Sequence, residues 1–168
     1  YNREVKMINY TEVKDIIKRK LIGIHMTNIG RAADMLWIQY GNFITAKNYK
    51  GEEVRKSEYA IHVQGPWSFM QNENILLSSN DILELGNKKG EKQLKEDNVL
   101  FDDKCEEFIK KVLPVTVRDV DISEDGSLNI LLSKNLRFQA ITDKNKKNEY
   151  WRFIDNNKKE HLVIFEEF

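Results

Sequence analysis

Hydrophobic residues near the start of the chain recur at the spacing of an α-helix. Within residues 9–23, one helical face carries the apolar side chains of Val13, Ile16, Ile17 and Leu21. Asn9 followed by Glu12 resembles a capping box, with Thr11 as the alternative cap, and Gly23 is expected to end the helix. We interpret the apolar face as one that packs on a sheet, and we keep a membrane-surface or partner-binding helix as the alternative.

After Gly23 the period of the pattern changes from about 3.6 to about 2, which predicts consecutive β-strands. Four segments follow this rule: residues 22–31, 33–44, 57–70 and 74–85. In the third segment, Ile61 and Val63 alternate with His62 and Gln64. His62 and Gln64 are therefore expected to share the face opposite the two aliphatic side chains.

A Gly-Pro-Trp tripeptide interrupts the third segment. Pro66 has no N–H to donate, so its strand is expected to lie at an edge of the sheet or to bulge, and Gly65 permits the kink. We expect Trp67 to turn into the core after this kink. In the alternative interpretation, the kink aims Trp67 and His62 at a ligand or at a protein partner.

A second helix is predicted over residues 101–114. One face of it carries Cys105, Phe108, Ile109 and Val112. Asp103 is the expected cap, with Glu106 as its capping partner, and Pro114 is expected to stop the helix. Cys105 is then a small buried hydrophobic residue, because nothing nearby in the sequence supplies the base that a reactive thiol needs.

The last third of the chain is typical of antiparallel strands. The predicted strands cover residues 115–123, 128–133, 136–142, 150–155 and 161–167. A change of phase between Val117 and Val120 indicates a β-bulge, and Asp125-Gly126 indicates a tight hairpin.

Alternation in the strand at residues 150–155 places Tyr150 and Arg152 on one face and Trp151 and Phe153 on the other. We expect Trp151 and Phe153 to lie in the core and Tyr150 and Arg152 to face the solvent.

No internal repeat and no domain boundary is evident, so residues 1–168 are predicted to form a single domain. The predicted fold class is α+β, with a mostly antiparallel sheet of roughly seven to nine strands and two helices packed on one side, because apolar faces must be paired. Residues 86–98 are the most polar stretch, and we expect an exposed loop there.

Composition narrows the class of protein. The 168 residues include 27 Lys and Arg and 27 Asp and Glu, so no net field favours nucleic acid or acidic membranes, and neither is expected as a partner. The uninterrupted apolar runs, such as those at residues 75–77 and 130–132, are far shorter than the ~18 residues of a membrane span. The single cysteine allows no intrachain disulfide, which fits a cytoplasmic protein.

Candidate chemistry is sparse. His25, His62 and His161 fall on different predicted strands without a partner at metal-ligand spacing, so no metal is expected. No linear signature of a nucleophilic, zinc-dependent or nucleotide-binding enzyme occurs, so no catalytic residue and no cofactor is predicted. Arg31 and Asp34 are close enough in sequence to form an ion pair or to clamp a substrate.

Four motifs follow one another along the chain: residues 29–41, residues 59–69, Ser-x-x-Asp-Ile at 78–82 and Glu-Tyr-Trp-Arg-Phe at 149–153. Together they resemble a family of small bacterial proteins of unassigned function in which a helix is followed by a large sheet. Members often read His-x-Gln-Cys-Pro-Trp-Arg, where this chain has Gly65 and Ser68 in place of the Cys and the Arg. A function of those two positions would be lost here, and the resemblance assigns no catalytic residue.

Two functions remain. The first is a non-enzymatic intracellular binding protein, such as an immunity-like protein that neutralises a toxin, because the chain is small, rich in charge and predicted to have edge strands. The alternative is a small-molecule-binding protein or an enzyme of unrecognised type, with its site around the strand face of His62 and Gln64. The candidate binding residues are His62, Gln64, Trp67, Arg31, Tyr150 and Arg152.

Overall fold

Ten strands and two long helices dominate the computed structural model, which describes residues 9–82, 100–142, 149–158 and 160–165. The first half holds α1 (Tyr10–Leu21), β1 (His25–Ala32), β2 (Met35–Lys47), β3 (Glu53–Val63), β4 (Trp67–Gln71) and β5 (Asn74–Ser78). The second half holds α3 (Leu100–Val112), β6 (Val115–Ile122), β7 (Leu128–Leu132), β8 (Leu136–Ala140), β9 (Glu149–Asp155) and β10 (Glu160–Phe165). The loop expected at residues 86–98 lies outside the described residues.

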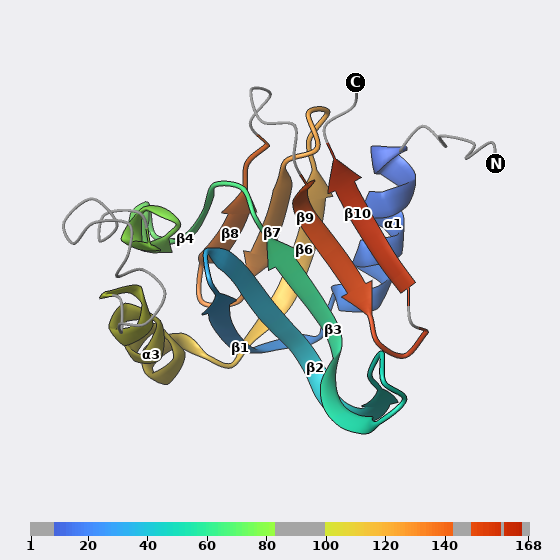
Figure 1. The fold of residues 1–168 in the computed structure, drawn as a ribbon. Coiled ribbons are helices and arrows are strands. Elements are labelled where there is room, and N and C mark those ends of the chain that lie inside the picture. Colours follow the sequence, from blue (N-terminus) through green and yellow to red (C-terminus); the bar gives the residue numbers. More distant parts are fainter. Residues whose placement is uncertain (1–8, 83–99, 143–148, 159, 166–168) are drawn as a thin grey trace.

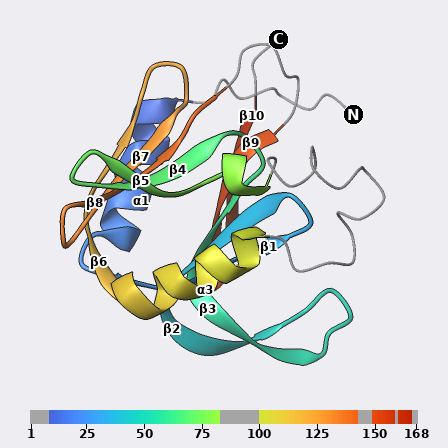
Figure 2. The same ribbon diagram turned by 90° about the vertical axis from the view of Figure 1, so that its left-hand side faces the viewer.

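All ten strands belong to one antiparallel sheet, in the order β10-β9-β3-β2-β1-β6-β7-β8-β4-β5. The sheet divides at its centre, because β1 and β6 pair only through His25 with Thr116 and Met26 with Val115. Figures 1 and 2 show the two halves curling over one another, and their buried side chains form one apolar core. The predicted α+β class with an antiparallel sheet is confirmed.

Helix α1 closes one side of this core. Asn9 Oδ1 accepts hydrogen bonds from the backbone N–H of Thr11 at 3.0 Å and of Glu12 at 3.4 Å, which confirms Asn9 as the cap. Ile17 and Leu21 on the predicted apolar face are fully buried. Where β6 has parted from β1, α1 lies alongside it.

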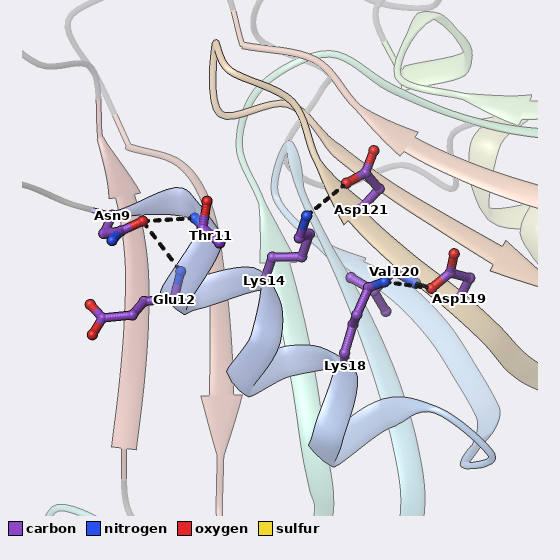
Figure 3. A network of polar contacts seen from close by, with 8 residues as sticks. All are labelled: Asn9, Thr11, Glu12, Lys14, Lys18, Asp119, Val120 and Asp121. Atoms are coloured by element: carbon purple, nitrogen blue, oxygen red, sulfur yellow. Dashed lines mark hydrogen bonds and ion pairs between the residues drawn. The ribbon is translucent and has the colours of Figure 1, made fainter.

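Two ion pairs join α1 to β6. Lys14 Nζ lies 3.7 Å from Asp121 Oδ1, and Lys18 Nζ lies 3.1 Å from Asp119 Oδ1 (Figure 3). The distance between the two lysines along the helix matches the distance between the two aspartates along the strand, because four helical residues rise about 6 Å and two strand residues rise about 6.6 Å. Both carboxylates are mostly exposed, so the pairs contribute little stability and chiefly set how the helix lies along the strand.

Helix α3 covers the corresponding part of β1. Its buried residues include the predicted Cys105, Phe108 and Val112. Because the helix already includes Leu100, Asp103 lies in the first turn and is not the cap, contrary to the prediction. Cys105 Sγ lies 3.7 Å from the carbonyl oxygen of Ile29, and burial raises the pKa of the thiol to about 11, so the residue is a buried hydrophobe as expected.

The strand order reads the same from either edge of the sheet once the two halves of the chain are exchanged. Each half runs from one helix into five strands, so α1 corresponds to α3, β1 to β6, and β5 to β10. Each helix contacts the central strand of the other half. The two halves therefore share one topology, a structural duplication with an approximate two-fold relation in the strand order, and sequence patterns alone did not reveal it.

The correspondence extends to single hydrogen bonds. Asn28 Oδ1 accepts from Ile29 N at 3.0 Å in β1, and Asp119 Oδ1 accepts from Val120 N at 2.9 Å in β6. Each bond stands directly after a register shift, and the shift in β6 is the bulge predicted from the change of phase. The two central strands thus bend by the same local device.

The last two strands of each half pair with the opposite half. The hairpin of β4 and β5 pairs with β8 through β4, and the hairpin of β9 and β10 pairs with β3 through β9. Residues 67–69 in β4 and residues 151–153 in β9 share the pattern Trp-x-Phe, and all four of these aromatic side chains are buried. Each half of the sheet is therefore completed by a hairpin from the other half.

The kink at Gly65 and Pro66 is where the chain crosses between the halves. β3 lies between β2 and β9, and β4 lies between β8 and β5, so neither is the edge strand that Pro66 predicted. The backbone N–H groups of Gln64 and Gly65 both donate to the carbonyl oxygen of Tyr150 at the crossing. Pro66 is tolerated because the strand has ended before it, and no ladder hydrogen bond is required of it.

A buried ion pair ties α1 to β9. Lys20 Nζ lies 2.7 Å from Asp155 Oδ2, and the two side chains are 17% and 3% exposed. Burial alone would raise the pKa of Asp155, but hydrogen bonds from Lys20 and from the backbone N–H of Asn157 outweigh it and hold this pKa below its usual value. The ionised carboxylate therefore stabilises the folded state.

We expect Asp155→Asn to lower the free energy of unfolding by about 2 kcal/mol at pH 7, because Lys20 loses its buried counter-ion. The folded-state pKa of Asp155 lies below the unfolded value of about 3.9, so its stabilisation is present above about pH 4 and is lost as the pH falls through the folded-state pKa. Urea unfolding at pH 7 and at about pH 3 measures both effects. Asp34→Asn, at an exposed position, is the control; a difference that persists undiminished at low pH contradicts the assignment.

We also expect the two halves of the chain to fold only together. In residues 1–90 alone, β3 and β4 each lack one of their two neighbouring strands, β9 and β8. Residues 91–168 alone lack the reciprocal neighbours, so each half leaves apolar strand edges exposed. Co-expressed, the two pieces should form an equimolar complex with the circular dichroism spectrum of the intact chain. A single half that is folded and monodisperse in size-exclusion chromatography would disprove this.

Candidate functional site

Four of the predicted site residues lie close together where β3 pairs with β9. His62 and Arg152 are opposite one another in the β3–β9 pair, and Trp37 is opposite His62 in the β2–β3 pair. Gln64 directly follows the end of β3 and Tyr150 lies near the start of β9, where Gln64 N donates to Tyr150 O at 2.8 Å. We call these five residues the His62 face. His62 is partly exposed and Gln64 is exposed, whereas Ile61 and Val63 are fully buried, which agrees with the alternation of burial expected for this segment.

Tyr150 departs from its prediction within this face. It is only 4% exposed, although alternation along β9 led us to expect it at the solvent-facing surface. Its ring packs over the kink, where a Cβ added at Gly65 would lie 3.3 Å from Tyr150 Cδ1. Arg152 is half-buried. Tertiary packing at the crossing between the halves thus overrides the strand pattern at this end of β9.

Trp67 lies in the core, as the first of its two interpretations predicted. It is 3% exposed, and its ring centroid is 5.9–6.5 Å from those of Phe69, Phe101 and Phe138. These distances are typical of packed aromatic pairs. Trp67 therefore joins α3 to β4 and β8 and is separate from the His62 face.

Arg31 is not part of the His62 face, although it directly follows Gly30, over which the ring of Trp37 packs. Its Nε and Nη2 atoms lie 2.8 Å from the two carboxylate oxygens of Asp102, and Nη1 donates to the carbonyl oxygen of Ala33 at 3.0 Å. The partner is thus Asp102 on α3 and not the predicted Asp34. The first turn of α3 brings a carboxylate to the end of β1, a placement that sequence distance could not indicate.

The internal duplication shows that the His62 face is specific to one half of the chain. The counterparts of Trp37, His62 and Arg152 in the β7, β8 and β4 strands are Asn129, Gln139 and Ser68. The indole of Trp37 occupies the space above Gly30, where any Cβ would collide with the ring. An aromatic and basic row therefore stands where the other half carries small or uncharged polar side chains.

Among the described residues, a two-stranded arm departs clearly from the two-fold symmetry. β7 and β8 are joined by a short turn at residues 133–135, whereas β2 and β3 continue past Tyr40 and Tyr59 as a hairpin of residues 41–58, which we call the arm. In the described part of the chain, residues 43–47 pair only with residues 53–57. Figures 1 and 2 both show the arm projecting from the body.

The base of the arm is fixed by a contact between Gly41 and Glu58. Gly41 has φ +81°, and a Cβ there would meet the Glu58 side chain. Asn42 N donates to Glu58 Oε2 at 2.8 Å, and Asn156 Nδ2 donates to the carbonyl oxygen of Ser57 at 2.8 Å. These contacts set the direction in which the arm leaves the sheet.

The tip of the arm is a hydrogen-bonded turn around Asn48. Its Oδ1 accepts from Lys50 N at 2.9 Å and from Glu52 N at 3.0 Å, and its Nδ2 donates to Glu52 Oε2 at 2.9 Å. Gly51, with φ +78°, allows the chain to turn. The turn presents Tyr49, which at 92% is the most exposed large hydrophobic residue in the described part of the chain.

The sequence predictions left residues 45–56 unassigned and so missed the arm. The signal was present, because Phe43, Thr45 and Lys47 continue the alternation of the preceding strand and Asn48 and Gly51 are turn residues. The pattern could not indicate that this hairpin leaves the sheet, since that depends on β9 pairing with β3 only at residues 59–63.

Two surface hollows are lined neither by Trp37, His62 or Arg152 nor by residues of the arm. One of about 180 Å³ at the kink is lined by Asp34, Gln64, Gly65, Pro66, Ser79, Asn80 and Ile82. The other, of about 320 Å³, is lined by Met70, Asn72, Glu73, Leu131, Asn135 and Arg137. Of the His62 face, only Gln64 lines either hollow.

Metal-binding geometry is absent from the described residues, where no three His, Cys, Asp or Glu side chains come together. His25 Nδ1 contacts Thr116 Oγ1 at 3.0 Å, at the centre of the two-fold arrangement, so this histidine serves the β1–β6 junction. No helix in the described ranges is long and apolar enough to cross a membrane.

Comparison with known proteins places the chain in no family. A scan against protein-family models found no match, and searches of curated proteins and of solved structures gave no significant match. The class of protein is therefore defined by the fold itself: an α+β protein made of two helix-and-strand units that exchange their terminal hairpins.

We expect Arg31→Gln to lower the free energy of unfolding by about 1–2 kcal/mol, because it removes a bidentate, largely buried ion pair with Asp102. Arg31→Lys should recover only part of this loss, since an ammonium group cannot match both oxygens. Urea denaturation of Arg31→Gln, Asp102→Asn and the double variant gives the coupling energy. The assignment fails if Asp34→Asn, the control, couples to Arg31 as strongly as Asp102→Asn does.

Proposed function

We propose that this protein is a non-enzymatic binding protein of the cytoplasm that recognises another protein, and that it acts as an immunity-like protein that neutralises a toxin. The arm carries the proposal. It is a long, ordered extension that the corresponding hairpin of the other half lacks, and Ser57 is the only buried residue in it.

The energetics of the arm support a role outside the fold. An isolated two-stranded hairpin is marginally stable in water, and the arm adds almost no apolar burial to the core. It nevertheless exposes the rings of Phe43 and Tyr49. Exposed aromatic residues on a rigid projection are typical of protein interfaces, where they act as anchors.

A small-molecule site or an unrecognised enzyme at the His62 face is the second candidate. The observation that favours it is the adjacency of Trp37, His62 and Arg152 on three neighbouring strands. An indole, an imidazole and a guanidinium in one row offer stacking together with hydrogen-bond donors, which would suit a planar anionic ligand.

Affinity purification with the intact protein as bait, under gentle lysis of the cells that naturally produce it, distinguishes the two candidates. We expect one protein partner, identified by mass spectrometry, to bind the wild type and to be lost when residues 41–58 are replaced by the Ser-Lys-Asn turn of residues 133–135. This replacement copies a turn that the chain already uses between corresponding strands, so thermal unfolding should show that the variant remains folded.

The matched control is the double variant His62→Gln and Arg152→Ser, which copies Gln139 and Ser68 of the other half. It should bind the partner like the wild type. Loss of binding in this variant, with full binding in the variant that lacks the arm, would place the protein contact on the His62 face and not on the arm. A wild-type bait that retains no protein would refute the proposed function and leave the second candidate.

A further inference from the structure

We infer that the arm recognises an acidic, concave surface of the partner protein, with Tyr49 inserted into it as the central anchor. This inference rests on the proposed function and adds the chemistry of the partner's site. The contact surface consists of the tip and of the exposed side of the arm, which we call the recognition face: Phe43, Thr45, Lys47, Glu53 and Arg55.

Tyr49 is held ready for insertion before any partner binds. The three side-chain hydrogen bonds of Asn48 fix the turn, and a backbone bond from Gly51 N to Asn48 O at 3.0 Å closes it. A tip already ordered in its exposed form loses little conformational entropy on binding. A tyrosine ring on such a tip offers a large contact area with few rotatable bonds and a hydroxyl that can bond at the base of a pocket.

A second aromatic contact lies on the recognition face. Phe43 is 48% exposed, and the guanidinium of Arg55 stands 4.6 Å from the centre of its ring. Thr45 is opposite Arg55 in the register and extends the same surface toward the tip. The opposite side of the arm, with Ile44, Ala46 and Val54, is half-buried, so the recognition face is the side that the arm presents to solvent.

The charge of the arm selects the partner's surface. The arm contains four basic and three acidic residues, whereas the whole chain is balanced, and one of the acidic residues, Glu58, accepts the backbone N–H of Asn42 at the base. One acidic residue, Glu52, is engaged by Asn48, while cations stand beside both exposed rings, with Lys50 Nζ 5.6 Å from the centre of Tyr49 and Arg55 over Phe43. An acidic surface would pair with these cations and would speed association by electrostatic steering.

A protein fits this surface better than a nucleic acid does. Glu53 lies opposite Lys47 on the recognition face, so a run of phosphates along the arm would meet a carboxylate among the cations. A single projecting aromatic tip suits a pocket, whereas binding of single strands uses a row of exposed rings. The long loops that bind concave epitopes of other proteins use the same geometry as the arm.

The partner identified by affinity purification, once purified, tests the inference by titration calorimetry. We expect Tyr49→Ala and Arg55→Glu each to weaken binding at least about tenfold, whereas Tyr49→Phe should keep most of the affinity. Arg137→Glu, an equivalent change at an exposed arginine on β8, is the matched control and should have a much smaller effect. The wild-type affinity should fall several-fold between about 50 mM and about 300 mM salt, and this dependence should be weaker for Arg55→Glu.

Each other result counts against the inference. A partner that binds the variant lacking residues 41–58 as tightly as the wild type refutes the arm as the contact while leaving the proposed function intact. Equal effects of Arg55→Glu and Arg137→Glu, or an affinity independent of salt, refute the acidic surface. A double-stranded DNA or RNA oligonucleotide that binds the wild type more tightly than the protein partner does identifies a nucleic-acid surface instead, and failure to capture any protein removes the proposed function and the inference together.

Discussion

The short pairing of β1 with β6 is the constraint on which the rest of the structure depends. The two halves of the sheet are joined there by the register pairs of His25 with Thr116 and Met26 with Val115 and by two backbone hydrogen bonds of Val117 with Gly23 and Ile24, and both central strands bulge directly afterwards. Their unpaired lengths must be covered by something other than a strand. Because each helix runs directly into one of these strands, α1 comes to lie beside β6 and α3 beside β1, and their apolar faces complete the core.

The exchanged hairpins connect the two halves of the sheet a second time, away from the β1–β6 junction. β4 and β5 extend the second half, β9 and β10 extend the first, and the crossing at Gly65 and Pro66 lets the chain move between them without a broken ladder. The Trp-x-Phe segments of β4 and β9 place large rings in the shared core, so the halves interlock through packing as well as hydrogen bonds. Two ion pairs then hold the helices in place. Lys20 with Asp155 ties α1 to β9, and Arg31 with Asp102 ties β1 to α3.

Departures from the two-fold symmetry are where a specific function can be located. Positions that correspond in the two halves stabilise the fold in the same way: Asn28 and Asp119 each accept a backbone hydrogen bond at the bulge of their strand. The arm has no such counterpart, and the row of Trp37, His62 and Arg152 replaces small or uncharged polar side chains. Both features lie outside the core, so they could diverge without disturbing its packing, and the arm differs further in being ordered by its own hydrogen bonds.

The sequence alone determined the local elements, because helix caps, apolar periodicity and turn residues act over a few neighbouring positions. The cap at Asn9, the bulge in β6, the buried Cys105 and the alternation of burial around His62 all follow from such patterns. Tertiary structure alone decided which strands meet. It buried Tyr150 at the crossing, gave Arg31 a partner on α3 and let the hairpin of residues 41–58 leave the sheet, since each outcome depends on pairing between residues far apart in the chain. The duplication was hidden for the same reason: a core position requires an apolar side chain of suitable size, so the buried faces of α1 and α3 can use different residues, such as Ile17 and Phe108.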